Sequence, residues 1–182
     1  MGKRHDQPLN IRPFIHDAHL VKAEMQVPGQ CRLYLTSDFI SAHNKLAVDT
    51  IYTITIKGAY AADIKAYRYT YTPRLVSEVG DEKIYETEYS EFEEFHTPEQ
   101  FADRINSDPS WEILSGETYD VDESSVLKLD MISNDHPSYL LVIAGTEIMY
   151  EAAGVPTTIE YLMKIGTAYW EAWRASTKSN ES

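Results

Sequence analysis

The sequence has few of the features that mark secreted, membrane-spanning or disulfide-stabilised proteins. Its 182 residues include one cysteine, Cys31, so no disulfide can form within the chain and a disulfide-stabilised extracellular fold is not expected. No apolar stretch follows the charged residues 1–6, so no signal peptide is expected. The most apolar run, 139–145, is much shorter than the roughly 20 residues that a membrane-spanning helix needs. These absences predict a soluble protein without a membrane partner.

Basic residues are also scarce. Lysine and arginine number 16 against 29 aspartates and glutamates, which gives a formal net charge of −13 and a pI near 4.8. Nucleic-acid binding depends on clustered lysine and arginine, so we do not expect tight nucleic-acid binding. The excess of acid is local, because residues 78–124 carry 16 acidic and 2 basic side chains and the flanking regions nearly balance. The functional question is therefore what residues 78–124 face.

The chain lacks the short motifs of common enzymes. It contains no glycine-rich phosphate loop, nucleophile elbow, kinase signature or dinucleotide fingerprint. His16 and His19 have no cysteine partner nearby, and the acidic run at 120–124 lacks the glycine and distal glutamate of a calcium loop. Cys31 is interpreted as a small buried hydrophobe. We therefore predict a protein that is not an enzyme, with no catalytic residue, no cofactor and no metal ligand.

What the sequence does contain is a composition typical of a folded domain, 43% hydrophobic with 12% aromatics. Alternation of apolar and polar residues predicts half-buried strands. The predicted strands cover 31–36, 51–57, 64–72, 83–89, 111–114, 125–132 and 139–143. We expect 51–57 and 64–72 to pair as an antiparallel hairpin, 139–143 to be fully buried, and 115–124 to form a polar loop.

Helix signals are clearest at two places. Thr97 as N-cap, Pro98 at the first helical position and Gln100 as the partner in a capping box predict a helix that ends near 106–109. After Pro156, apolar residues recur every three or four positions, which predicts an amphipathic C-terminal helix. The expected fold class is α+β: a mainly antiparallel sheet with one short capped helix packed on it and a C-terminal amphipathic helix.

Three regions follow from these patterns. Residues 1–30 contain three prolines and no sustained periodicity, so we expect an extended N-terminal arm that is ordered only by lying on another surface. Residues 31–154 are expected to form the α+β core domain, with an acidic insert at 73–96. Residues 155–182 form the C-terminal helix and tail, where Gly166 in the apolar stripe predicts a closely packed neighbour.

The order of elements from residue 50 to about 145 resembles a known family. The residues that carry the resemblance are Tyr52-Thr-Ile-Thr-Ile-Lys-Gly58, the strand end Tyr69-Thr-Tyr-Thr72, the helix start Thr97-Pro-Glu-Gln-Phe-Ala102, and the strands Trp111-Glu-Ile-Leu114 and Val126-Leu-Lys-Leu-Asp130. This order is similar to the small α+β module of tailed-bacteriophage virion proteins, which occurs in tail, neck and nozzle subunits. The resemblance implies a structural subunit that repeats around a ring or tube, with no catalytic residue to carry over.

The predicted function is therefore a ring- or tube-forming tail or neck component of a tailed-phage virion, made in the host cytoplasm. Its expected partners are copies of itself and other virion proteins. The candidate interface residues are Lys3, Arg4, Arg12, Tyr67, Tyr69, Tyr71, Tyr169, Trp170 and Trp173. An acidic surface would repel DNA phosphates in a conduit, and its candidate residues are Glu86, Glu88, Glu91, Glu93, Glu94, Asp120, Asp122 and Glu123.

Several other functions stay open at this point. The regularly spaced glutamates of the acidic segment would also suit an inhibitor that imitates DNA and occupies the phosphate-binding groove of a host defence protein, with steep salt dependence. Tyr67, Tyr69 and Tyr71, on one strand face, would suit a sugar or base platform. A small hydrolase or a sugar-binding accessory protein would additionally need a pocket.

Overall fold

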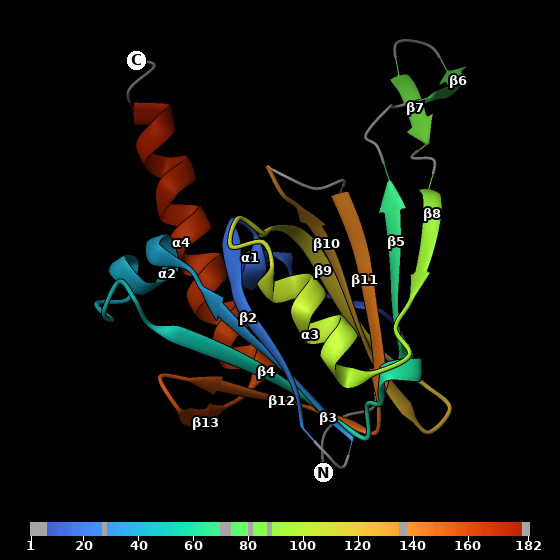
Figure 1. Cartoon of the computed structure of the whole chain (residues 1–182). Helices are drawn as coiled ribbons and strands as arrows, with labels where there is room; N and C mark the ends of the chain where they lie inside the picture. The colour runs from blue at the N-terminus through green and yellow to red at the C-terminus, as the bar shows by residue number, and fades with distance from the viewer. Residues whose placement is uncertain are drawn as a thin grey trace.

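The chain forms a curled antiparallel sheet flanked by helices (Figure 1). This computed structural model describes residues 7–26, 29–69, 74–79, 82–86, 89–134 and 138–179. The strands are β1 (Leu9–Asn10), β2 (Ala18–Gln26), β3 (Gln30–Thr36), β4 (Ile51–Lys57), β5 (Ile64–Tyr69), β6 (Arg74–Val79), β7 (Glu82–Glu86), β8 (Tyr89–Glu94), β9 (Glu112–Val121), β10 (Ser124–Ile132), β11 (Ser138–Gly145), β12 (Glu147–Ala152) and β13 (Val155–Thr157). The helices are α1 (Arg12–Ile15), α2 (Asp38–His43), α3 (Pro98–Asn106) and α4 (Ile159–Ser179), with a 3-10 turn η1 (Ala61–Asp63). The predicted α+β class is confirmed.

The main sheet has the strand order β13-β12-β4-β3-β2-β9-β10-β11-β5-β8, with β1 added alongside β9. It folds back on itself, because β12 and β4 of one half contact β10 and β11 of the other. Strands β6 and β7 form a separate hairpin, which lies beyond the ends of β5 and β8 (Figure 1). The molecule is therefore a folded-over sheet with two facing halves, in which the terminal strands β13 and β8 of the described order are not paired with each other.

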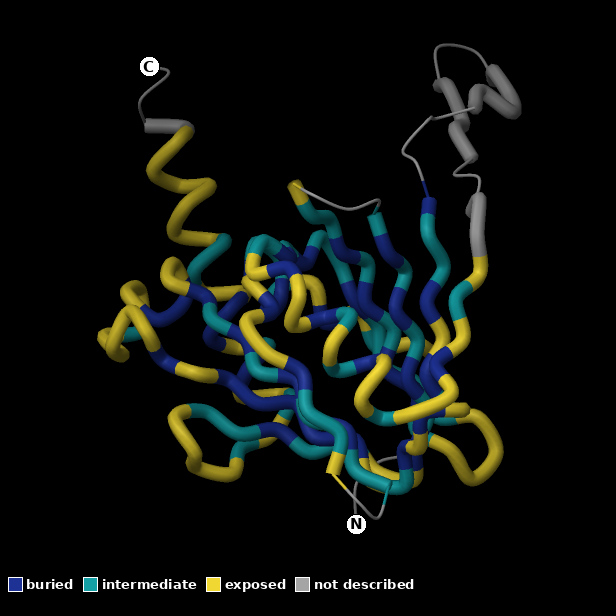
Figure 2. Tube along the Cα trace, in the orientation of Figure 1, coloured by how far each residue is buried: buried dark blue, intermediate teal, exposed yellow. Residues whose placement is uncertain are grey.

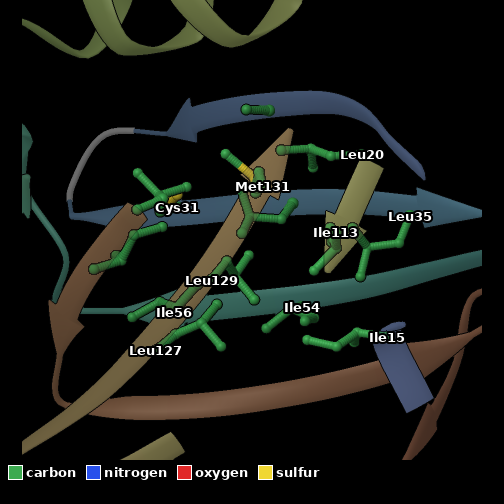
Figure 3. Packing of buried hydrophobic residues seen from close by; sticks show 14 of the residues in the cluster. Ile15, Leu20, Cys31, Leu35, Ile54, Ile56, Ile113, Leu127, Leu129 and Met131 are labelled. Carbon is green, nitrogen blue, oxygen red and sulfur yellow. The ribbon is translucent and has the colours of Figure 1, made fainter. Parts of the chain in front are cut away.

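The core lies between the two halves of this sheet. Figure 3 shows side chains from β3 and β4 directed toward side chains from β9 and β10. The residues labelled there on these four strands are all fully buried: Cys31, Leu35, Ile54, Ile56, Ile113, Leu127, Leu129 and Met131. Because successive side chains of a strand point to opposite faces, the alternating pattern of each strand supplies one apolar face to this core.

The capped helix forms as predicted. Thr97 is the N-cap of α3, and its Oγ1 accepts a hydrogen bond from the Gln100 backbone N–H at 3.3 Å. The Gln100 side chain reaches back one residue further than a capping box requires, because its Oε1 accepts from the His96 backbone N–H at 2.9 Å. Phe101 and Ile105 then bury the apolar side of α3, which packs on β2.

The predicted N-terminal arm is wrong for residues 9–26. Ile11, Phe14, Ile15 and Leu20 are each at most 1% exposed, so this segment supplies core residues of its own. β2 pairs with β3 and with β9 near the middle of the sheet. The prolines misled the prediction, because Pro13 sits in the first turn of α1, where its missing N–H costs no hydrogen bond.

The expected hairpin of 51–57 with 64–72 is also wrong. β4 pairs with β3 and β12, whereas β5 pairs with β11 and β8, so the two strands belong to opposite halves of the sheet. The segment between them carries the chain across: Gly58 has φ +67°, and the Asp63 carboxylate accepts a hydrogen bond from the Tyr60 backbone N–H at 2.9 Å at the start of η1.

Two further expectations on the β9–β11 region are corrected. Residues 115–121 are not a polar loop but the larger part of β9, where Ser115 and Glu117 stand opposite Asp130 and Lys128 of β10. The strand at 138–145 is not fully buried, because its residues alternate between buried and half-buried. Both strands bury a single face, which is the usual condition in an antiparallel sheet with solvent on one side.

Candidate functional site

The three apolar anchors predicted on α4 are divided between intramolecular packing and exposure. Trp170 Nε1 donates a hydrogen bond to the Pro13 carbonyl oxygen at 3.1 Å, and its ring lies 5.2 Å from that of His16. Tyr169 stacks on Phe39 of α2 with ring centroids 5.9 Å apart. Tyr169 and Trp170 therefore hold α4 against α2 and α1 and are half-buried.

Gly166 explains how α4 approaches α1 so closely. A Cβ placed on Gly166 would lie 2.1 Å from the Pro13 carbonyl oxygen and 2.9 Å from the Phe14 Cα. No real side chain fits in that space, so the predicted closely packed neighbour of Gly166 is confirmed, and it is the backbone of α1.

Beyond this contact α4 leaves the body of the molecule. Residues 171–177 are all exposed, and Figures 1 and 2 show the helix extending past α1 and α2 into solvent. Trp173 is 49% exposed, although its ring touches that of Trp170 at 5.9 Å. Of the predicted interface aromatics, Trp173 is therefore the one that α4 presents to solvent.

The tyrosines of β5 have unequal environments. Tyr67 and Tyr69 do share a face, since they oppose Leu140 and Ser138 of β11. Tyr67 is half-buried with its ring 5.0 Å from that of Phe92, which is itself 48% exposed. Tyr69 is 4% exposed and hydrogen-bonds to Asp130, so as an interface or ligand-platform residue it is a wrong prediction.

The other predicted interface residues lie on α1 or outside the described part of the structure. Arg12 is exposed on α1, with its Nη2 3.5 Å from the His16 Nε2. Lys3, Arg4 and Tyr71 lie outside the described residues.

Glu93, predicted as part of an acidic surface, is instead neutralised by two arginines. Its Oε2 lies 3.1 Å from Arg68 Nη2 and 3.6 Å from Arg104 Nε. Tyr139 completes the cluster: its hydroxyl accepts from both guanidinium Nε atoms at 2.9 and 2.8 Å and donates to Glu93 at 2.8 Å. The three charged side chains are 21–29% exposed. The cluster joins β5, β8, β11 and α3.

The electrostatics of this cluster are those of a structural network. Burial, followed by the hydrogen bond to Glu93, raises the pKa of Tyr139, so the phenol stays protonated and can act as the bridging donor. Each of the four side chains has an ion-pair or hydrogen-bond partner within the cluster. The sequence carries a partial signal for Arg68, because strand alternation puts it on the same face as Ala66 and opposite to Tyr67 and Tyr69.

The other described acidic residues lie elsewhere. Glu94 is exposed on β8, where it is the strand-register partner of Lys65 on β5. The side chains of Glu86, Glu88 and Glu91 lie outside the described part of the structure. Asp122 and Glu123 form the turn between β9 and β10, where Asp122 has φ +54°, and Asp120 accepts a hydrogen bond from Ser125 Oγ at 2.7 Å.

That turn forms one wall of a groove of about 620 Å³, which we call the seam groove. Its other walls are β12, β13 and the start of α4, so it lies between the β9–β10 turn and the β12–β13 hairpin. Ile148, Tyr150 and Ile159 supply apolar surface, and burial raises the pKa of Tyr150, which hydrogen-bonds to Thr118. The acidic residues that line the groove are Asp120, Asp122, Glu123, Glu147 and Glu160.

Sequence reasoning missed Glu147 and Glu160 as neighbours of the 120–123 turn. They stand 24 or more positions along the chain from Glu123, and only the return of β12 toward β10 brings them to the same groove. Glu147 is paired with Lys57 at 2.9 Å, and no lysine or arginine among the described residues lines the groove itself.

Among the residues that the structure describes, neither Cys31 nor a histidine belongs to a metal site. Cys31 is fully buried in β3, and burial raises the pKa of its thiol to about 12. In the part of the chain that the structure describes, no group of three histidine, cysteine or carboxylate side chains is arranged to hold a metal ion. No described helix is long and apolar enough to cross a membrane.

Known proteins add nothing to this picture: no family model, curated protein or solved structure matches the chain. Function must therefore be argued from the surfaces themselves, the free end of α4, the Arg68–Arg104–Glu93–Tyr139 cluster and the seam groove.

Proposed function

We propose that the protein is a non-enzymatic structural subunit that assembles with copies of itself, as a ring- or tube-forming component of the tail or neck of a tailed phage. The observation that carries the proposal is the free end of α4. Residues 171–177 are all exposed, and Trp173 exposes about half of its surface there.

A free helix end of this kind favours a partner for a physical reason. The part of α4 from residue 171 to 179 is about 13 Å long at 1.5 Å per residue. Isolated helical segments of that length are marginal in water and gain stability mainly by burying an apolar side. Tryptophan is the residue type that most often dominates the binding energy of an interface. The end of α4 is therefore suited to dock on a neighbouring subunit.

The ends of the sheet support the same proposal. β8 and β13 terminate the described strand order, so each has one side without a sheet neighbour among the described strands. Open strand edges can pair with another chain and are usually shielded unless assembly covers them. The resemblance of residues 50–145 to virion modules of tailed phages gives the class of assembly.

The test compares two alanine variants on the same helix. Trp173 and Tyr161 are 49% and 47% exposed, at the free and the docked end of α4 respectively. We expect wild-type protein to form oligomers in size-exclusion chromatography with light scattering. Trp173→Ala should weaken them at least about 30-fold, because interface hot spots cost 2 kcal/mol or more, whereas Tyr161→Ala should not.

Two results would refute the proposal. A wild-type chain that stays monomeric at all concentrations and is missing from purified virions would remove the assembly role. Equal loss of oligomers in both variants would show that the free end of α4 is not the contact. Thermal unfolding of each variant, monitored by circular dichroism, verifies that the fold is retained.

A further inference from the structure

A hollow of about 680 Å³ borders the Arg68–Arg104–Glu93–Tyr139 cluster, and we call it the α3 pocket. It lies between residues 93–96 and residues 100–107, where β8 leads into α3 (Figure 1). Its volume is within the range of pockets that hold small molecules. The cluster therefore faces a space of ligand size, besides joining β5, β8, β11 and α3.

Arg104 brings unused hydrogen-bond donors to this pocket. Its Nε donates to the Tyr139 hydroxyl at 2.8 Å and lies 3.6 Å from Glu93 Oε2, whereas its two Nη atoms make no hydrogen bond to a described residue. The guanidinium also lies 5.5 Å from the centre of the Tyr139 ring, so its position is fixed before any ligand binds. A guanidinium that presents a free pair of donors suits a carboxylate, which it binds through two parallel hydrogen bonds.

Glu93 and Gln100 supply complementary groups. Every contact of the Glu93 carboxylate with a described residue is made by Oε2, which leaves Oε1 to accept a further hydrogen bond. Gln100 Oε1 accepts from the His96 backbone N–H at 2.9 Å, and the Nε2 amide of Gln100 has no acceptor among the described residues. A hydroxyl group both donates and accepts, so it can use either of these atoms.

The charges around the pocket restrict which anions fit. Glu94 and Asp103 also line it, and both are exposed. Together with Glu93 they place three carboxylates beside two arginines, so acid exceeds base in the lining. These carboxylates repel a dianion such as phosphate more strongly than a monoanion, and they accept hydrogen bonds from ligand hydroxyls. The lining therefore favours a single carboxylate accompanied by hydroxyl groups.

We propose that the α3 pocket binds a small hydroxycarboxylate of the sugar-acid type. The ligand carboxylate accepts from the two Nη atoms of Arg104, a ligand hydroxyl donates to Glu93 Oε1, and the Gln100 amide donates to a second ligand oxygen. Tyr139 is a positioning residue, because its hydroxyl fixes the Nε of Arg104. This site is separate from the free end of α4, so its failure would leave the proposed assembly intact.

A titration of the ¹⁵N-labelled full-length protein, followed by NMR, tests the site with D-glucuronate, D-glucose, acetate and inorganic phosphate. We expect D-glucuronate to give saturable shifts of the backbone amide signals of residues 93–107. D-Glucose lacks the carboxylate, acetate lacks the hydroxyls and phosphate carries excess charge, so each should bind at least about 10-fold more weakly. Equal affinity for D-glucuronate and any of the other three probes would overturn the proposal, as would the absence of saturable shifts with D-glucuronate.

A lysine variant tests the role of Arg104. Arg104→Lys keeps the charge but removes the paired donors, so it should weaken D-glucuronate binding at least about 10-fold. Arg174→Lys makes the same change on the exposed end of α4 and is the matched control, whose affinity should equal that of wild type. Unchanged affinity in a folded Arg104→Lys variant would overturn the proposal. Thermal unfolding verifies the fold, and if this variant does not fold, the four probes on the wild-type protein decide the question.

Discussion

Gly166→Ala should destabilise the protein strongly, although alanine is the best helix former and glycine one of the poorest. In an exposed helix this substitution gains about 1 kcal/mol. In α4 the new Cβ would lie 2.1 Å from the Pro13 carbonyl oxygen and 2.6 Å from its carbonyl carbon, whereas ordinary contacts begin at 3.4 Å. The obstructing atoms are backbone, so no side-chain rotation relieves the clash.

The expected magnitude follows from what must move. Relief of the clash requires α1 and α4 to separate by about 1 Å, which disturbs the packing of the buried Phe14 and breaks the Trp170–Pro13 hydrogen bond. Overpacking of a core costs typically 1–3 kcal/mol and a lost hydrogen bond about 1 kcal/mol. Set against the gain in helix propensity, the net loss should be about 2 kcal/mol.

Urea unfolding followed by circular dichroism measures this loss. Thr167→Ala is the matched control, because Thr167 is exposed on the adjacent position of α4 and the substitution tests helix propensity alone. The control should be neutral or slightly more stable than wild type. A Gly166→Ala variant as stable as wild type would refute the reasoning, since it would mean that the backbone of α1 does not lie against this position.

Three further predictions concern buried polar groups. Tyr139→Phe removes the hydroxyl that bridges Arg68, Arg104 and Glu93, and urea unfolding should show a loss of about 1–3 kcal/mol; an unchanged midpoint would contradict the network. Cys31 is fully buried with its thiol pKa raised to about 12, so a thiol reagent at pH 8 should modify it in urea and not in native protein. Burial raises the pKa of Asp130 despite its hydrogen bond from Tyr69. A raised pKa means that the folded protein favours the protonated carboxyl of Asp130. The stability gained from that protonation is present at low pH and is lost as the pH rises from the pKa of the unfolded chain to the higher pKa of the folded protein. Asp130→Asn should therefore flatten that part of the curve of unfolding free energy against pH, and an unaltered curve would count against this assignment.

Local signals determined the individual elements of this protein. The α3 start at Thr97 and Pro98 depends on contacts within four residues, so it was visible in the sequence. The alternation at 51–57 and 125–132 and the apolar stripe of α4 likewise reflect periods fixed by backbone geometry. Gly166 was informative for the same reason, since a glycine in a helix stripe has few explanations besides a close neighbour.

The pairing partner of each strand could not be predicted from local sequence patterns. Residues 51–57 and 64–69 have equally good strand patterns, and nothing within them says that β4 joins β3 and β12 while β5 joins β11 and β8. Pairing is decided by which arrangement buries all apolar faces at once, and that is a property of the whole chain. The N-terminal segment was misjudged on the same ground, because its buried residues have partners that are distant in sequence.

The acidic residues show most clearly which properties follow from the sequence and which from the tertiary structure. The sequence by itself determined that the acid is concentrated in residues 78–124. Only the tertiary structure decided what those charges do: Glu93 is neutralised by Arg68 and Arg104, whereas Asp122 and Glu123 stand at the rim of a groove with Glu147 and Glu160. The reason is physical, because the effect of a charge depends on its distance from other charges and from water, and folding sets those distances by joining strands far apart in the chain.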